Sequence, residues 1–334
     1  MDKKVNKSGG LTLMGVLTAL GLAKAGWILY SKRYIDHHAK VNLILDAEHH
    51  TYHSPTAGAI NYYVNGQGNQ TPLLLIHGLH LYAGLHDVLP ILEAFRTSRP
   101  IYAIDLPGFG GSEKTDRPYR PAMFQEAISD FIKNQIGQPC HVLTLGNASS
   151  FASMAAVTDP EWIRSLVMIN PRGFEMPHTT TLKGQNYRDR LLDLFLSYLK
   201  IPLWSLPIYD FLASRAKITT FYQKRFSYSA PGDLIEVAYT SAHQAGVHFA
   251  PIVLLSGKLN VPDLREKYYE KLTHPVYVVY DNEPGVSFDM LPQLVHEKSN
   301  WAAFRSRNTR GMPHFERSGE IFRQFDMFWK KHDK

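Results

Sequence analysis

The chain has 334 residues, which at about 150 residues per domain predicts two units, or one large α/β domain that carries an insertion. With 44% hydrophobic, 12% aromatic and 20% charged residues, its composition excludes a disordered, a collagen-like and a polytopic membrane protein. Residues 1–40, with seven basic and two acidic side chains, supply +5 of the net charge of +6, so the rest is almost neutral and we expect no nucleic-acid-binding face. The single cysteine, Cys140, excludes an intramolecular disulfide framework and a cysteine-based zinc site.

The first predicted element is an apolar helix over residues 11–30, in which Lys24 is the single charged side chain. At 1.5 Å per residue, 20 helical residues span about 30 Å, which is enough to cross a bilayer. Trp27 and Tyr30, with basic residues beyond both ends of the segment, are typical of a helix that ends at lipid headgroups. We therefore expect residues 1–45 to form a membrane anchor and a linker.

Other interpretations of this segment stay open. It could be a cleaved signal peptide, with Ala23, Lys24 and Ala25 as an A-x-A cleavage site, or a helix that packs on the body. Because basic residues flank both ends, charge barely decides the orientation of an anchor, and a cytoplasmic body is only weakly favoured.

The body alternates short apolar runs with segments of helical length. The predicted strands are 59–64, 73–76, 101–104, 142–145, 166–169 and 276–280, and the predicted helices are 88–95, 122–136, 149–158 and 321–331. Apolar, β-branched runs separated by helices indicate strands that are buried on both faces by crossover helices. We therefore expect an α/β fold with a doubly wound, mostly parallel sheet, formed by residues 46–174 and 273–334.

A long insertion separates the last two of these strands. Residues 175–272 exceed any simple crossover and are rich in Leu, Tyr, Phe and Trp. They predict a helical cap over the carboxyl ends of the strands. Its apolar side chains fit either core packing or the wall of a cavity for a small hydrophobic ligand.

Three motifs occur in a characteristic order: LLLIHGLH at 73–80, DLPGFGGS at 105–112 and the strand–turn–helix segment 141–170. Together they resemble the α/β-hydrolase superfamily over residues 59–331, with a cap that matches only in position. The resemblance implies an esterase-like or lipase-like fold. No P-loop or dinucleotide fingerprint occurs, so we expect no cofactor. It also implies an oxyanion hole formed by the backbone N–H groups of Leu79 and Asn147.

The nucleophile turn departs from the family pattern G-x-S-x-G. If Gly146 is taken as the first glycine of that pattern, Ala148 occupies the position of the serine. If the spacing to Pro160 decides, Gly146 itself occupies it, and we prefer this alignment because Thr144 and Ala148 then keep both flanks small. Neither alignment supplies a serine.

The acid and histidine positions follow from the same comparison with the family pattern. After the strand 276–280, Glu283 fits the family acid if the turn is one residue short, with Asp281 as the second choice. In the loop TRGMPHFE at 309–316, matching the family's proline, second histidine and acid places Gly311 where the catalytic histidine belongs. The resemblance is closer to a poorly characterised group of bacterial hydrolase-fold proteins that carry an N-terminal anchor and this same loop.

The preferred hypothesis is thus impaired or atypical catalysis, with a hydrophobic or acyl ligand bound under the cap. One alternative is an active carboxylic-ester hydrolase in which Ser149 or Ser150 is a displaced nucleophile, His314 the base and Glu283 its orienting acid. Another is a membrane-tethered interaction protein without catalysis. The 16 histidines lack metal-binding patterns such as H-E-x-x-H, so no metal is expected.

Overall fold

The structure, a computed structural model, describes residues 8–39, 41, 47–66, 68–176, 191, 194, 198–199, 201 and 203–333. The side chains of residues 8–17, 19 and 20 are outside this description. Part of the predicted linker, 42–46, and most of the first part of the predicted cap, 177–190, also lie outside the described residues.

The centre of the body is an eight-stranded sheet in the order β1-β2-β4-β3-β5-β6-β7-β8. From β3 onwards neighbouring strands are parallel, whereas β1 and β2 are antiparallel. The expectation of a mostly parallel sheet is therefore confirmed, although the run 59–64 lies in an antiparallel strand. The bounds are β1 (Glu48–Ser54), β2 (Gly58–Asn65), β3 (Leu73–Ile76), β4 (Ile101–Ile104), β5 (Cys140–Leu145), β6 (Ile163–Ile169), β7 (Val276–Tyr280) and β8 (Trp301–Arg305).

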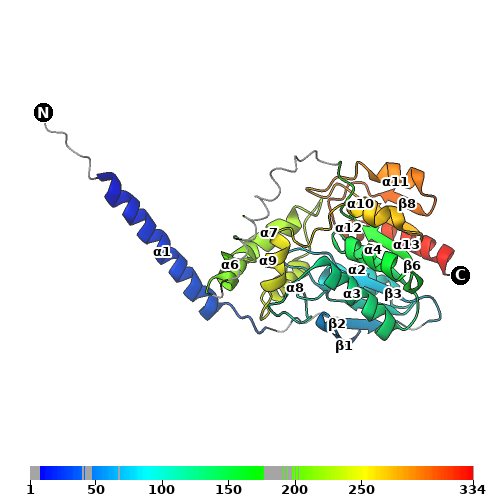
Figure 1. Cartoon of the computed structure of the whole chain (residues 1–334), viewed down its shortest axis with the longest axis horizontal. Coiled ribbons are helices and arrows are strands. Elements are labelled where there is room, and N and C mark those ends of the chain that lie inside the picture. The colour runs from blue at the N-terminus through cyan, green and yellow to red at the C-terminus, as the bar shows by residue number, and fades with distance from the viewer. Residues whose placement is uncertain are drawn as a thin grey trace.

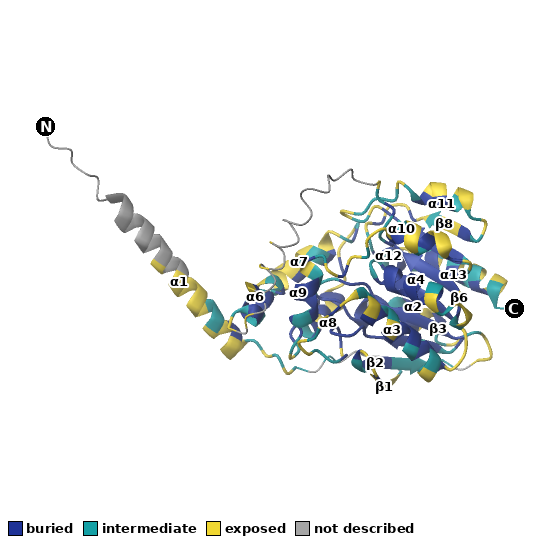
Figure 2. Cartoon of the chain, in the orientation of Figure 1, coloured by how far each residue is buried: buried dark blue, intermediate teal, exposed yellow. Residues whose placement is uncertain are grey.

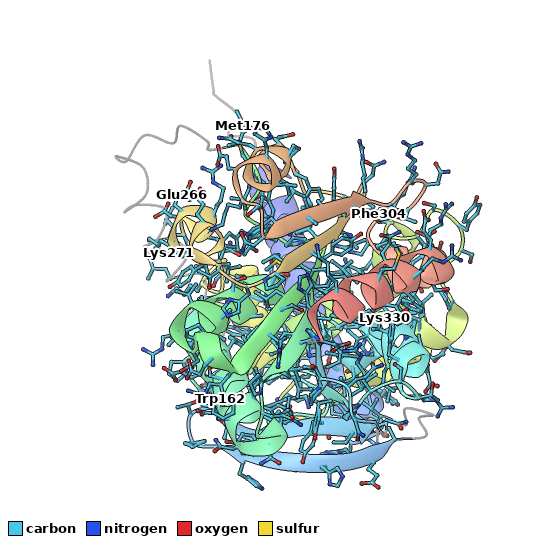
Figure 3. The ribbon with its side chains drawn as sticks, turned by 90° about the vertical axis from the view of Figure 1, so that its right-hand side faces the viewer. Trp162, Met176, Glu266, Lys271, Phe304 and Lys330 are labelled. Carbon is cyan, nitrogen blue, oxygen red and sulfur yellow. The ribbon has the colours of Figure 1, made fainter. Side chains whose placement is uncertain are left out.

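Both faces of the sheet are covered by helices, which explains the continuous apolar runs of its inner strands. In β3, Leu74 and Ile76 pack on one face and Leu73 and Leu75 on the other. The first face carries α3 (Pro121–Phe131), α4 (Ala148–Thr158) and α11 (Leu291–Glu297), and the second carries α2 (Leu89–Phe95) and α13 (Ser318–His332). Figure 3 shows α13, with Lys330, on the opposite side of the sheet from Trp162, which follows α4.

The described residues between β6 and β7 include several helices. They form α6 (Ser205–Leu212), α7 (Arg215–Gln223), α8 (Gly232–Ser241), α9 (Phe249–Leu255) and α10 (Leu264–Lys267). An apolar cluster joins Tyr82, which follows β3, to Tyr209, Ile218 and Tyr222 of these helices. Because of this packing, α6, α7 and α8 lie against the loop that follows β3.

The N-terminal helix α1 (Ser8–Tyr34) extends away from the body, and the described part of its surface is largely exposed (Figures 1 and 2). Its last turns contact α6, where Trp27 Nε1 donates to the carbonyl of Pro207 at 2.7 Å and Ser31 donates to Asp210 at 2.5 Å. Among the residues that the structure describes, no helix has the length and hydropathy that a membrane span requires.

Candidate active-site cavity

The turn between β5 and α4 bends at Gly146, which adopts a φ of +52°. Residues that carry a side chain rarely adopt this left-handed backbone conformation. A nucleophile elbow imposes the same strained backbone geometry on its central residue. An ideal Cβ built on Gly146 would meet no atom within 4 Å, so the bend faces open space. Ala148, by contrast, is a fully buried residue of α4. The geometry of the turn therefore favours the alignment that places Gly146, and not Ala148, at the nucleophile position.

Gly146 borders a small cavity of about 70 Å³ beneath the cap. Leu79, which follows β3, and Asn147, which precedes α4, line the same cavity, as the oxyanion-hole assignment requires. His77 braces this region, because its Nδ1 donates to the carbonyl of Gly78 at 2.6 Å and its Nε2 accepts from the N–H of Leu106 at 2.9 Å. The imidazole of the H-G motif thus holds the loop after β3 against the loop after β4.

At the histidine position, Gly311 has a φ of +130° and its N–H donates to Asp281 Oδ2 at 2.7 Å. A Cβ at Gly311 would lie 3.2 Å from Cγ of Arg225 and 3.2 Å from Cγ of Glu283. A side chain there would therefore need both neighbours to move. A β-carbon at this position would thus be crowded by an arginine from the cap and by the candidate acid.

The two acidic candidates have different surroundings. Asp281 is buried directly after β7 and accepts from Asn170 Nδ2 at 3.0 Å and from Gly311. No histidine of the described residues is hydrogen-bonded to it. Burial raises the pKa of Asp281, and these hydrogen bonds oppose the rise. Asp281 therefore closes the loop that contains Gly311.

Glu283 lines the cavity itself. Its Oε1 lies 3.6 Å from Arg225 Nη2 and 4.0 Å from Arg172 Nη2. Burial raises the pKa of Glu283 to about 7, and the two guanidinium groups limit the rise. This carboxyl group thus titrates near neutral pH, although it has no imidazole to orient.

The displaced-nucleophile residues are not joined to one another by hydrogen bonds. Ser149, which is fully buried, is hydrogen-bonded to Thr144 at 2.8 Å, and Ser150 Oγ donates to the carbonyl of Asn147 at 2.5 Å. His314 Nε2 donates to the carbonyl of Asp87 at 2.7 Å, and burial lowers the pKa of His314 to about 4. The contacts of these residues are those of helix-start and loop positions.

The loop TRGMPHFE holds the cap and the sheet together. His314 reaches Asp87, as described above, and Glu316 Oε1 accepts from the N–H of Ser227, which follows α7, at 2.6 Å. The polar residues of this motif therefore have contacts that maintain the fold.

A polar network that the sequence analysis did not anticipate lies beside the cavity. His80 Nε2 donates to Asp87 Oδ2 at 2.8 Å, Tyr222 of α7 donates to Asp87 Oδ1 at 3.0 Å, and His86 donates to Tyr222 at 3.1 Å. Burial would raise the pKa of Asp87, but His80 and His86 hold it well below its usual range. Within the described part of the chain, no group of three His, Cys, Asp or Glu side chains is placed to hold a metal ion.

The comparison with protein families agrees with this geometry. Residues 73–323 match the model of the alpha/beta hydrolase family, and the chain belongs to that family. No curated protein sequence matches the chain significantly.

Several solved structures share the fold. A membrane phospholipase A, described as a bacterial virulence factor, is 18% identical, with a TM-score of 0.64 over 96% of this chain and 97% of its own. A putative lipase from Acinetobacter baumannii AYE is 15% identical, with a TM-score of 0.66 over 100% and 99%. Carboxylesterase CesB from Bacillus subtilis is 14% identical, with a TM-score of 0.65 over 92% and 97%. At these identities the likeness establishes the fold.

Proposed function

We propose that this member of the family does not hydrolyse esters through a catalytic triad and instead binds a small acyl or hydrophobic ligand in the cavity under the cap. The observation that carries the proposal is the pair Gly146 and Gly311. The first offers no nucleophile at the bend, and the second offers no base and is crowded by Arg225 and Glu283.

Acyl transfer requires an attacking group and a base within hydrogen-bonding reach of it. Glycine supplies neither. Where triad members are removed from a serine hydrolase, the oxyanion hole and substrate binding leave only a small fraction of the acceleration. A cavity that keeps Leu79 and Asn147 in place therefore retains the means to bind an acyl oxygen without the means to break the ester.

The alternative, an esterase that uses Ser149 or Ser150 with His314 and Glu283, would need these groups to rearrange. The hydrogen bonds of Ser149 to Thr144 and of His314 to Asp87 favour the binding function instead. A pKa of about 4 keeps His314 neutral at pH 7. Its Nε2 is used as a donor, so Nδ1 is the nitrogen that could accept a proton, and this atom is buried without a hydrogen-bond partner among the described residues.

The test is to incubate the full chain with p-nitrophenyl esters of short and medium acyl length and with a fluorophosphonate probe. We expect no turnover above that of the heat-denatured protein and no covalent label, with an active carboxylesterase as the positive control. The variants Ser149→Ala, Ser150→Ala and His314→Ala should behave like the parent. Turnover or labelling that any one of these substitutions abolishes would establish the displaced triad and refute the proposal.

We further propose that α1 tethers the protein to a membrane, with the body on the cytoplasmic side. The support is the apolar composition of residues 11–30, the exposure of Leu22 and Leu29, and the stacking of Tyr30 between Trp27 and Tyr34. One structural neighbour is itself called a membrane phospholipase. The full chain should stay in the membrane fraction after carbonate washing, and external protease should spare its body in intact cells. Complete release by carbonate would contradict the tether, and digestion of the body would contradict the orientation.

A further inference from the structure

Two arginines face the cavity from different parts of the fold. Arg225 follows α7 of the cap and Arg172 follows β6, and both line the cavity together with Glu283. The guanidinium carbon of Arg225 lies 3.8 Å from the centroid of the Phe221 ring. This stacking fixes the plane of the guanidinium group and leaves its N–H edge as the part that can bind a ligand.

The protein contacts of that edge are long. Arg225 Nη1 lies 3.5 Å from the carbonyl of Phe221, and its Nη2 lies 3.6 Å from Glu283 Oε1. Short N–H···O hydrogen bonds are about 2.7 to 3.2 Å, so neither contact is the close bidentate pair that a guanidinium group forms with a carboxylate. The guanidinium group of Arg225 is therefore charged and held in place, and its N–H groups can still donate to a ligand.

The wall of the cavity that contains Gly146 also favours an anion. Gly146 and Asn147 precede α4, an 11-residue helix whose N-terminus carries a partial positive charge, and Leu79 also lines the cavity. Because Gly146 has no side chain, the space in front of this wall is open. At about 70 Å³ the cavity can accept a group of two or three heavy atoms, the size of a carboxylate.

A larger groove adjoins the cavity. It has a volume of about 580 Å³ and shares Asn147 and Arg172 with the cavity. Its lining is mostly polar, with charged residues such as Glu175, Arg265 and Glu266. Leu254, Leu259 and Val261 are among its apolar residues. A ligand with its polar head at Gly146 can therefore extend a short aliphatic tail along these three residues.

We propose that the cavity binds the carboxylate of a small organic acid with an aliphatic tail, between the N–H edge of Arg225 and the start of α4. This inference rests on the proposed function, because it requires a ligand-binding cavity and names the chemistry of its ligand. A free acid is what remains when an ester has been cleaved, so the site would accept as its ligand the type of product that active hydrolases release.

Glu283 makes the binding sensitive to pH. Its carboxyl group is faced by Arg225 and Arg172 and, from the end of β7, by Asp281, while His80 and Asp87 lie on the same cavity. When Glu283 is ionised it competes with the ligand for the arginines, and when it is protonated it does not. Since its pKa is about 7 and the carboxylate of a fatty acid stays ionised well below that value, affinity should rise as pH falls from 8 to 6.

The experiment is isothermal titration of the detergent-solubilised full chain with hexanoate, hexanamide and inorganic phosphate at pH 6 and pH 8. We expect hexanoate to bind at least tenfold more tightly than hexanamide or phosphate, and more tightly at pH 6. Arg225→Gln should weaken hexanoate at least tenfold, while Arg225→Lys should weaken it less. Arg215→Gln, which removes an exposed arginine of α7 that pairs with Glu236, should leave the affinity unchanged.

Glu283→Gln should bind hexanoate at both pH values as tightly as the parent does at pH 6. It also serves as the second variant should Arg225→Gln fail to fold, since it keeps the arginine. Equal affinity for acid and amide, stronger binding of phosphate, or a Glu283→Gln protein with an unchanged pH dependence would each overturn the inference. Failure of the proposed function is a separate result, namely ester turnover in a protein that still binds hexanoate through Arg225.

Discussion

The carboxylate of Asp87 accepts a 2.8 Å hydrogen bond from His80 in a site where both Asp87 and its second partner, Tyr222, are almost completely buried. Asp87 lies between β3 and α2, and Tyr222 belongs to α7 of the cap. The carboxylate of Asp87 therefore links the cap to the segment that follows β3. Removing the carboxylate leaves His80 and Tyr222 without their acceptor, whereas an amide keeps one acceptor oxygen.

We therefore expect Asp87→Ala to lower the free energy of unfolding by about 3 to 5 kcal/mol and Asp87→Asn by about 1 to 3 kcal/mol. Urea unfolding followed by circular dichroism measures both values. Asp326→Ala, which removes an exposed partner of Lys330 on α13, is the control and should cost less than about 1 kcal/mol. Equal, small effects at Asp87 and Asp326 would mean that the network does not hold the cap.

The bend at Gly146 accepts a side chain at a cost set by its backbone alone. Gly146→Ser should lower the free energy of unfolding by about 1 to 2 kcal/mol, because a serine must adopt a φ of +52° but meets open space. Gly137→Ser is a matched control, since Gly137 has a φ of +70°, equal space and no place on the cavity.

The new serine should not produce an esterase, because Gly311 supplies no base and a β-carbon there would be crowded by Arg225 and Glu283. Gly146→Ser should hydrolyse p-nitrophenyl acetate no faster than Gly137→Ser does. Turnover specific to Gly146→Ser would show that a base near the bend had been overlooked, with His80 the first residue to replace.

Much of the sheet could be predicted because burial on both faces produces runs such as LLLI and VYVVY. Strand β8 was not predicted, since it lies at the sheet edge, and Trp301 is the only fully buried residue among its five positions. Strand β1 was missed for a related reason, because only Tyr52 and Ser54 of its seven residues are buried. Edge strands have little apolar pattern to detect.

Some residues of the candidate site could be predicted from the sequence and others could not. Gly146, Gly311 and Glu283 follow from motifs that keep their spacing along the chain, so the sequence locates them. Arg225 and Tyr222 come from the cap, and Tyr222 lies 135 residues from Asp87. Local sequence patterns do not predict contacts between residues so far apart in the chain. The charged residues that the cap adds to the cavity could therefore be identified only from the structure.

Buried histidines make the stability of the protein depend on pH. The pKa of His314 is lowered by burial from 6.5 to about 4, so the unfolded chain takes up a proton there before the folded chain does. The contribution of His314 is fully present above pH 6.5 and is lost as pH falls towards 4. At pH 5 the loss amounts to about 2 kcal/mol.

His314→Gln keeps a donor for the carbonyl of Asp87 but cannot titrate. We expect the drop in unfolding free energy between pH 7.5 and pH 5 to be smaller in this variant than in the parent. His50→Gln, at an exposed position on β1, should retain the full drop. If the unfolding free energies of the parent and His314→Gln change equally with pH, folding does not lower the pKa of His314.

The junction between α1 and the cap contains a buried carboxylate. Asp210 of α6 accepts from Ser31 at 2.5 Å and from His37 Nε2 at 3.1 Å, and its side chain is fully buried. Asp210→Ala should loosen the end of α1, because Ser31 and His37 lose their acceptor. The contacts that Trp27 keeps, a hydrogen bond to Pro207 and a ring contact with the exposed Phe211, lie earlier in α1 than residues 31–37.

Hydrogen exchange of the full chain measures this release directly. Amides of residues 31–37 should exchange at least tenfold faster in Asp210→Ala, since each 1.4 kcal/mol of lost local stability is a factor of ten. The amides of α8 and the sheet should keep their rates, and Asp233→Ala, at an exposed position of α8, should change neither set. If exchange accelerates throughout the cap instead, Asp210 stabilises the fold of the cap, and the position of α1 depends on other contacts.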